Sequence, residues 1–400
     1  MKIKYNIAIS RSTIANLVGA MLFFTAFTQI GLGGGSIYLI YFLPVICIFA
    51  VLILVLEKLQ KPTTSYPLIF MCALIIIAHI SIFSLQYIIS FVALTVALIA
   101  SLSSSLWHRV PTYAYIAMIL NTIIYFVEII LQFIGVNFDA SIFNYVDSGR
   151  SEIITTWGFE RYSAHHTEPG SFAINIGGLA VLSLMGTRAP NIFHWFAVLA
   201  MATTLSITAA IVTFIVITSI FVAREIRNKT IILSIVGLAI IIYFCFNIMP
   251  TLGLNVVEFL SYRLIDRGGA DGSIGVKSQL INELINRDWL SSMLGNRNTP
   301  CDICMYSKSL GFAFNIIYEG GLLGFIAIFS LFTVAIHRLG LRGLMLVLML
   351  SFMRVEFYYP QTIIIILAVF ALPRTVATRS NFVPANQAAP VPARATRFTK

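Results

Sequence analysis

Apolar runs of about 15 to 25 residues recur from one end of the chain to the other, and about 20 apolar residues are needed for a helix to cross a membrane. An outer-membrane barrel would instead show alternating segments of about ten residues. The chain is 58% hydrophobic and 10% charged, whereas about a quarter of the residues in soluble domains are charged. The pattern therefore predicts an all-α integral membrane protein.

Twelve membrane spans are expected within one polytopic membrane domain, residues 1–374. The first span follows a basic start and lacks a small-x-small cleavage site, so we interpret it as an uncleaved helix rather than a secretory signal. The run from Asn191 to Ala223 is long for one helix, and the placement of basic loops favours two helices joined by a tight hairpin near Thr204. The expected spans are 12–31, 36–56, 66–85, 87–106, 112–135, 170–187, 191–204, 205–223, 230–249, 310–336, 340–354 and 360–374.

Lysine and arginine gather in the short loops on one side of these spans, which predicts that this side is cytoplasmic. Both termini then lie in the cytoplasm, and the tail 375–400, rich in alanine, proline and arginine, is expected to be disordered. The formal charge of +10 reflects this topology, because no basic stripe interleaved with aromatic residues points to a nucleic-acid partner. The basic residues that set the orientation are Lys2, Lys4, Arg11, Lys58, Lys61, Arg109, Arg188, Arg224, Arg227, Lys229, Arg338, Arg342 and Arg374.

Two long polar loops, about 137–169 and 250–309, are predicted to be extracytoplasmic, and they hold most of the acidic residues. The first ends in RYSAHHTEPGSFA, where Arg161, His165, His166 and Glu168 lead directly into a span. Guanidinium groups at a membrane surface bind a pyrophosphate bidentately. The alternative is that Arg161 reaches lipid headgroups and Glu168 complements a helix dipole.

The second loop contains the segment from Val276 to Trp289, in which apolar residues recur at helical spacing. This spacing predicts an amphipathic helix lying on the membrane, with Lys277, Glu283 and Arg287 on its polar face. Cys301 and Cys304 form a C-x-x-C pair, for which a local disulfide is favoured over zinc or thiol exchange. Adjacent His165 and His166 also match known zinc sites poorly, so no metal is expected.

Together these features resemble the O-antigen polymerase and O-antigen ligase superfamily, whose fold is similar to other GT-C-like membrane glycosyltransferases. Besides RYSAHHTEPGSFA, the chain has TTLSIT (203–208), an arginine-containing second loop, a Leu294-Gly295 step and YEGGLLGF (318–325) in the family's order, over roughly residues 112–336. The resemblance implies a metal-independent glycosyltransferase of the bacterial inner membrane without a cofactor. Its substrates would be oligosaccharides linked to undecaprenyl pyrophosphate.

The resemblance and the charges together give a set of candidate site residues. A base would remove the acceptor proton and cations would neutralise the pyrophosphate; a carboxylate at a dry interface is suited to the first role. Glu128 and Gln132, on one face of the fifth span, are candidates to line the glycan cavity. The candidate catalytic residues are Glu168, His166 and His165, and the candidate pyrophosphate-binding residues are Arg161, Arg263, Arg267, Arg150, Lys277 and Arg297.

Three functions are compatible with these features. A repeat-unit polymerase of polysaccharide or lipopolysaccharide biosynthesis is favoured, because the ligases of the family resemble one another in a second-loop histidine after the glycine that matches Gly295, and this loop has none. A ligase that transfers glycan to lipid A core is the nearest alternative. A flippase is the alternative from another class, although no repeated halves are visible. The polymerase would contact membrane lipids, a flippase and a chain-length regulator.

Overall fold

The computed structural model describes residues 17–27 without 18, 22 and 25, then 108–135, 166, 169–186, 190–204, 206–223, 272–295, 310–353 and 360–372. All the elements in these ranges are helices. They are α6 (Val110–Phe133), α8 (Pro169–Ser183), α9 (Ile192–Thr203), α10 (Ile207–Ala223), α13 (Gly272–Ile285), α14 (Trp289–Leu294), α15 (Phe312–Leu339), α16 (Leu341–Phe352) and α17 (Pro360–Ala371). The expected spans 36–56, 66–85, 87–106 and 230–249 and the tail 375–400 lie outside the described residues.

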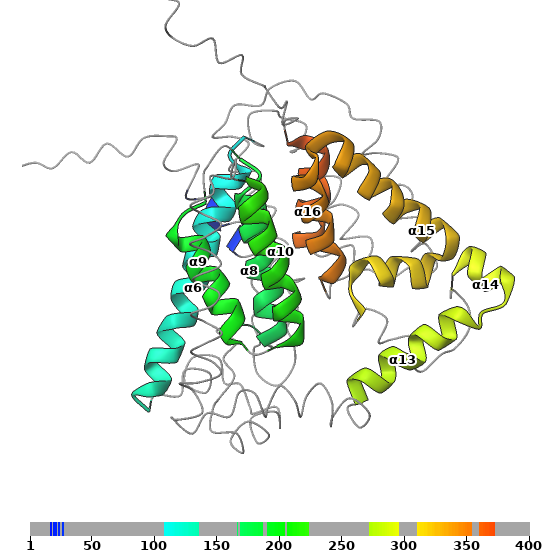
Figure 1. Ribbon diagram of the computed structural model, residues 1–400, viewed down its shortest axis with the longest axis horizontal. Helices are drawn as coiled ribbons and strands as arrows, with labels where there is room; N and C mark the ends of the chain where they lie inside the picture. The colour runs from blue at the N-terminus through cyan, green and yellow to red at the C-terminus, as the bar shows by residue number, and fades with distance from the viewer. Residues whose placement is uncertain are drawn as a thin grey trace, which may run out of the picture.

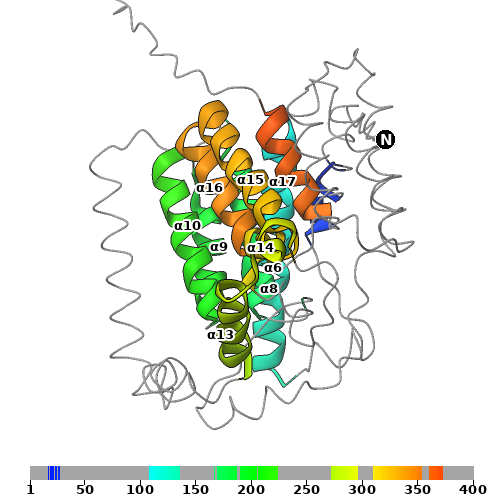
Figure 2. The same cartoon turned by 90° about the vertical axis from the view of Figure 1, so that its right-hand side faces the viewer.

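Helix α8 lies at the centre of the bundle, with α6, α9, α10 and α16 packed around it (Figure 1). Gly177 and Gly178 make this close packing possible. A Cβ atom on Gly177 would lie 2.3 Å from a methyl carbon of Val212 on α10, and one on Gly178 would lie 3.0 Å from the ring of Phe27. Small residues thus let neighbouring helices approach α8 closely, as they do between membrane helices. Figure 2 shows α15, α16 and α17 against the other side of the bundle.

Two of the described helices are long and apolar enough to cross a membrane, α6 over Val110–Leu131 and α15 over Phe312–Leu339. Both expose large apolar side chains, including Ile130 on α6 and Phe329 on α15. The remaining apolar helices are shorter, and a helix of 12 residues such as α9 extends only about 18 Å. Length and composition therefore support a membrane protein at the level of these two helices.

The run from Asn191 to Ala223 is two helices, α9 and α10, as predicted. Thr204 ends α9, and its hydroxyl donates to the carbonyl of Met201 at 2.7 Å. At the other end, the Asn191 side chain caps α9: its Oδ1 accepts from the backbone N–H of Phe193 at 3.2 Å. The backbone N–H of Asn191 donates to Nδ1 of His194 at 3.3 Å. The turn near Thr204 brings α10 back along α9.

Two arginines join the helix ends at one end of the bundle. Arg342 donates to the carbonyl of Gly186, just after α8, at 3.4 Å and to that of Ala223, the last residue of α10, at 3.3 Å. Arg338 donates to the carbonyl of Leu372, just after α17, at 3.4 Å. Cations suit helix C-termini, where carbonyls lack helical partners. These helix ends lie together, as the grouping of basic loops on one side requires.

Candidate functional site

Of the nine candidate residues, His166 is described with its side chain and Lys277 with its backbone, inside α13. The other seven lie outside the described residues, so their mutual placement stays a prediction. They are Glu168, His165, Arg161, Arg263, Arg267, Arg150 and Arg297.

His166 is 4% exposed and lies between α6 and α8. Its Nε2 is 3.4 Å from Oδ1 of Asn121 on α6, and its Nδ1 is 3.3 Å from Nδ2 of Asn175 on α8. Asn121 in turn donates its Nδ2 to the carbonyl of Ala117 at 2.9 Å. His166 thereby attaches the end of the first polar loop to α6 and α8, through residues that are 45 and 9 positions away in sequence.

These contacts define the proton positions on the His166 ring. Because Asn175 donates to Nδ1, that nitrogen is an acceptor, and the ring hydrogen sits on Nε2, which donates to Asn121; the amide orientations are those assigned by the network. Both ring nitrogens are therefore already engaged with side-chain amides. The geometry favours a positioning role for His166 over proton transfer to a substrate.

A chain of side-chain contacts runs from His166 along α6 to the hairpin between α9 and α10. The ring of Phe172 lies between His166 and Tyr125, with ring-centre distances of 5.4 and 4.4 Å. The Tyr125 hydroxyl lies 3.0 Å from that of Thr203, the first residue of the TTLSIT segment. Glu128, one turn further along α6, is also buried. His166, the TTLSIT segment and Glu128, which are far apart in sequence, thus share one region of the bundle.

Asn175 has one polar atom left over. Its Oδ1 is buried and has no hydrogen-bond partner among the described residues, while its Nδ2 holds His166. A buried acceptor without a donor costs about 1–3 kcal/mol. The hydrogen-bond network around His166 therefore leaves one buried acceptor, Oδ1 of Asn175, without a donor among the described residues.

The second loop supplies the two helices α13 and α14, joined at residues 286–288. The predicted helix is confirmed as far as Ile285, and Trp289 begins α14 instead. Two of the predicted apolar residues are among the exposed ones, Ile285 at 72% and Trp289 at 73%, whereas Leu280 is fully buried. The Arg287 side chain, predicted on the polar face, is only 3% exposed.

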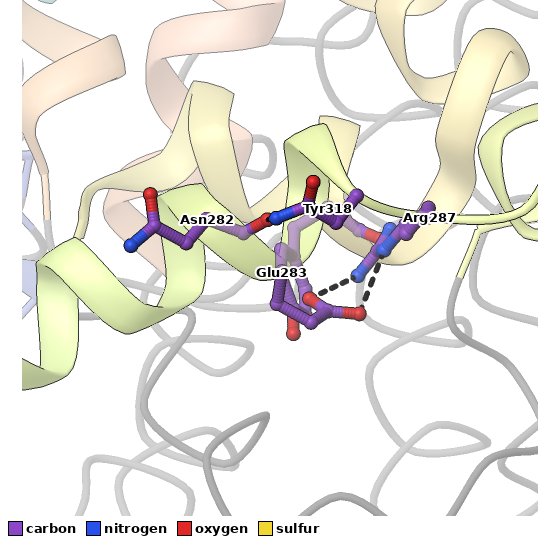
Figure 3. A network of polar contacts seen from close by, with 5 residues as sticks. Asn282, Glu283, Arg287 and Tyr318 are labelled. Carbon is purple, nitrogen blue, oxygen red and sulfur yellow. Dashed lines mark hydrogen bonds and ion pairs between the residues drawn. The ribbon is translucent and has the colours of Figure 1, made fainter.

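Arg287 is buried because it packs on the first part of α15 (Figure 3). Its Nε and Nη2 donate to the two carboxylate oxygens of Glu283 at 2.9 and 3.0 Å. Its Nη1 donates to the backbone carbonyl of Tyr318 at 2.6 Å, and its guanidinium carbon lies 4.0 Å from the centre of the Tyr318 ring. One guanidinium therefore joins α13 to α15 through an ion pair, a carbonyl and an aromatic ring.

Two glycine backbones meet directly beside this contact. Gly295 (φ +79°) follows α14, and a Cβ atom there would lie 1.8 Å from the carbonyl oxygen of Glu319. Gly321 (φ 54°, ψ −136°) breaks the helical geometry of α15, and a Cβ atom there would lie 2.6 Å from the amide nitrogen of Gly295. The Leu294-Gly295 step and the YEGGLLGF segment, 24 or more residues apart in sequence, are thus in backbone contact.

No family model matches the chain, and neither a curated protein nor a solved structure is found to be similar to it. The assignment of function therefore depends on the residues and geometry given above.

Proposed function

We propose that this protein is a bacterial polysaccharide repeat-unit polymerase, a polytopic glycosyltransferase of about twelve spans in the inner membrane. It would move a growing glycan from undecaprenyl pyrophosphate to a sugar hydroxyl of the next lipid-linked repeat unit at the outer face. The observation that carries the proposal is the segment RYSAHHTEPGSFA, in which a dense group of ionisable residues leads directly into α8. The attachment of His166 to α6 and α8 supports it, because it holds the end of that segment against the bundle.

The proposed reaction needs few groups. The acceptor hydroxyl oxygen attacks the anomeric carbon of the donor glycan, the bond from that carbon to the pyrophosphate oxygen breaks, and the hydroxyl proton passes to a base. The pyrophosphate leaves with its lipid and carries the bonding electrons. Because pyrophosphate is already a good leaving group, the protein must chiefly balance charge and hold the reactants in line.

Glu168 is the base that this arrangement favours. It directly precedes Pro169, the first residue of α8, and it lies two residues from His166, whose ring nitrogens are both engaged. His165 is the next candidate. Arg161, Arg263 and Arg267 are proposed to bind the pyrophosphate, because guanidinium groups match phosphate oxygens in pairs.

The test compares Arg161→Ala and Glu168→Ala in cells that assemble the polysaccharide. Glycan ladders are scored on gels, with protein abundance measured by immunoblot. Arg188→Ala is the matched control, because Arg188 lies in a loop predicted to face the cytoplasm. We expect both site variants to lose the ladder at normal abundance and the control to keep it. An unchanged ladder in both site variants would remove these residues from the site.

Two further results would redirect the assignment. Intact lipid-linked polymer over an unmodified lipid A core in a deletion strain would indicate the ligase reaction. Movement of lipid-linked sugar across reconstituted membranes without any elongation would indicate a transporter. Single repeat units on the core, by contrast, are what loss of a polymerase produces.

A further inference from the structure

Helix α15 is interrupted at Gly321, and Arg287 binds just before the interruption. The φ and ψ angles of Gly321, 54° and −136°, are not helical. Carbonyls in the last turn before such a break lack regular helical partners. The Tyr318 carbonyl, three residues before Gly321, accepts from Nη1 of Arg287 at 2.6 Å. Arg287 therefore stabilises the break from outside the helix, as a cation does at a helix C-terminus.

The charge of Arg287 is already balanced. Glu283, one turn earlier on α13, accepts two hydrogen bonds from it at 2.9 and 3.0 Å, and the Arg287 side chain is 3% exposed. In Figure 3 the guanidinium lies between Glu283 and Tyr318. A guanidinium occupied in this way differs from the cations predicted to bind pyrophosphate. Its role is to hold one helix on another.

The helix held by Arg287 carries a predicted site residue. Lys277 lies in α13, eight residues before Ile285, which corresponds to about 12 Å along a helix. Gly295, which follows α14, is fixed against Glu319 and Gly321, whereas Arg297 lies outside the described residues. The contact between Arg287 and α15 thus fixes the C-terminal end of the helix that carries Lys277.

We propose that Arg287 is a positioning residue that latches α13 and α14 onto the break in α15 and thereby sets where Lys277, a candidate cation on α13, stands relative to the bundle. This inference rests on the proposed function for the identity of the ligand. The forked pair with Glu283 fixes the guanidinium beside α13, and donation to the Tyr318 carbonyl attaches it to α15. The Glu283 carboxylate also contacts the Tyr318 side chain, and Arg287 holds that carboxylate in place.

The first experiment measures the latch without any substrate. Spin labels are attached at the exposed positions Ile281 on α13 and Phe329 on α15, in the full chain without its five native cysteines, and pulsed electron paramagnetic resonance gives the distance distribution in lipid nanodiscs. We expect one narrow distribution that broadens in Arg287→Met and stays narrow in Asn286→Ala. Asn286 is the matched control, because its exposed side chain bonds only within its own turn, to the carbonyl of Asn282. A narrow distribution in Arg287→Met would overturn the latch.

Two variants separate the latch from a simple ion pair. Glu283→Arg with Arg287→Glu keeps the pair of charges but turns a carboxylate toward the Tyr318 carbonyl, so we expect a distribution as broad as that of Arg287→Met. Arg287→Lys keeps a donor without the fork and should give an intermediate width. Full recovery in the charge-swapped variant would show that the pair alone suffices and would overturn the inference.

The second experiment measures binding of undecaprenyl pyrophosphate to the same full-length proteins in nanodiscs. We expect at least a tenfold weaker affinity in Arg287→Met and no change in Asn286→Ala, with thermal midpoints recorded for each variant. Unchanged affinity in Arg287→Met beside a broadened distance distribution would overturn the link from the latch to Lys277. Absence of binding by the unmodified protein would instead sink the proposed function, whereas the distance measurement would still decide whether the latch exists.

Discussion

Replacing Gly295 by alanine is expected to separate α14 from α15 and to destabilise the protein more than any other single glycine change compared below. Two costs add at this position. The φ of +79° is left-handed, which costs an L-residue about 1–2 kcal/mol. The new Cβ would lie 1.8 Å from the Glu319 carbonyl oxygen and 2.8 Å from the Gly320 nitrogen. These are backbone atoms that cannot rotate away, and overpacking of this kind costs about 1–3 kcal/mol or more.

The chain offers a control for each cost. Gly135, just after α6, has a φ of +83° with nothing within 4 Å of an added Cβ, so Gly135→Ala carries the conformational cost alone. Gly324 has no positive φ, but a Cβ there would lie 2.1 Å from the carbonyl oxygen of Ile316, so Gly324→Ala carries the packing cost alone. We therefore expect Gly295→Ala to lower the free energy of unfolding by about 3 kcal/mol and Gly135→Ala by about 1 kcal/mol.

The assay is thermal unfolding of the purified proteins in one detergent, followed by intrinsic fluorescence and by the temperature at which the protein leaves solution. The expected order of midpoints is Gly135→Ala highest, Gly324→Ala lower and Gly295→Ala lowest. If Gly295→Ala unfolds at the same temperature as Gly135→Ala, α14 and α15 do not make the close backbone contact described above.

Three other substitutions test the bundle. His166→Phe should lower the unfolding free energy by about 2–3 kcal/mol, because it leaves buried amide groups such as that of Asn175 without their partner; urea titration of the purified protein measures this. Tyr125→Phe should cost only about 0.5–1.5 kcal/mol in the same titration, since the ring stack persists and Thr203 keeps its bonds to backbone carbonyls; a loss as large as that of His166→Phe would refute this. Arg342→Gln should lower stability by about 1–2 kcal/mol by uncapping two helix ends, and the thermal midpoint should fall correspondingly; an unchanged midpoint would show that these bonds to carbonyls contribute nothing.

Periodicity and loop charge predicted the helices that the structure describes, because apolar length and basic flanks are read from consecutive residues. The hairpin near Thr204 is the clearest case, since the rule on basic loops required a turn there. The face of α13 was harder to predict. The spacing predicts an apolar and an ionic side. The burial of Arg287, however, depends on the Tyr318 carbonyl just before the interruption of α15, 31 residues away in sequence. Spacing within one helix carries no information about such a partner.

The surroundings of His166 show the same limit. His166 was a candidate because it stands in a dense ionisable segment, yet its role in the structure is decided by Asn121 and Asn175. Each asparagine is an amide within a largely apolar helix, and this was the available signal, because polar side chains in such helices usually have a partner. The placement of Arg161 and Glu168 remains a prediction, because it depends on where a long loop folds, and local pattern does not determine that.

The outward-facing ridge formed by Ile285 and Trp289 has a practical consequence for handling the protein. The Arg287 guanidinium is buried against α15, whereas Ile285 at the end of α13 and Trp289 at the start of α14 are exposed. A detergent belt that covered only the long helices would therefore leave this ridge in water. Short-chain detergents should therefore promote self-association through the second loop, whereas micelles or nanodiscs with enough headgroup-region area should keep single particles apart.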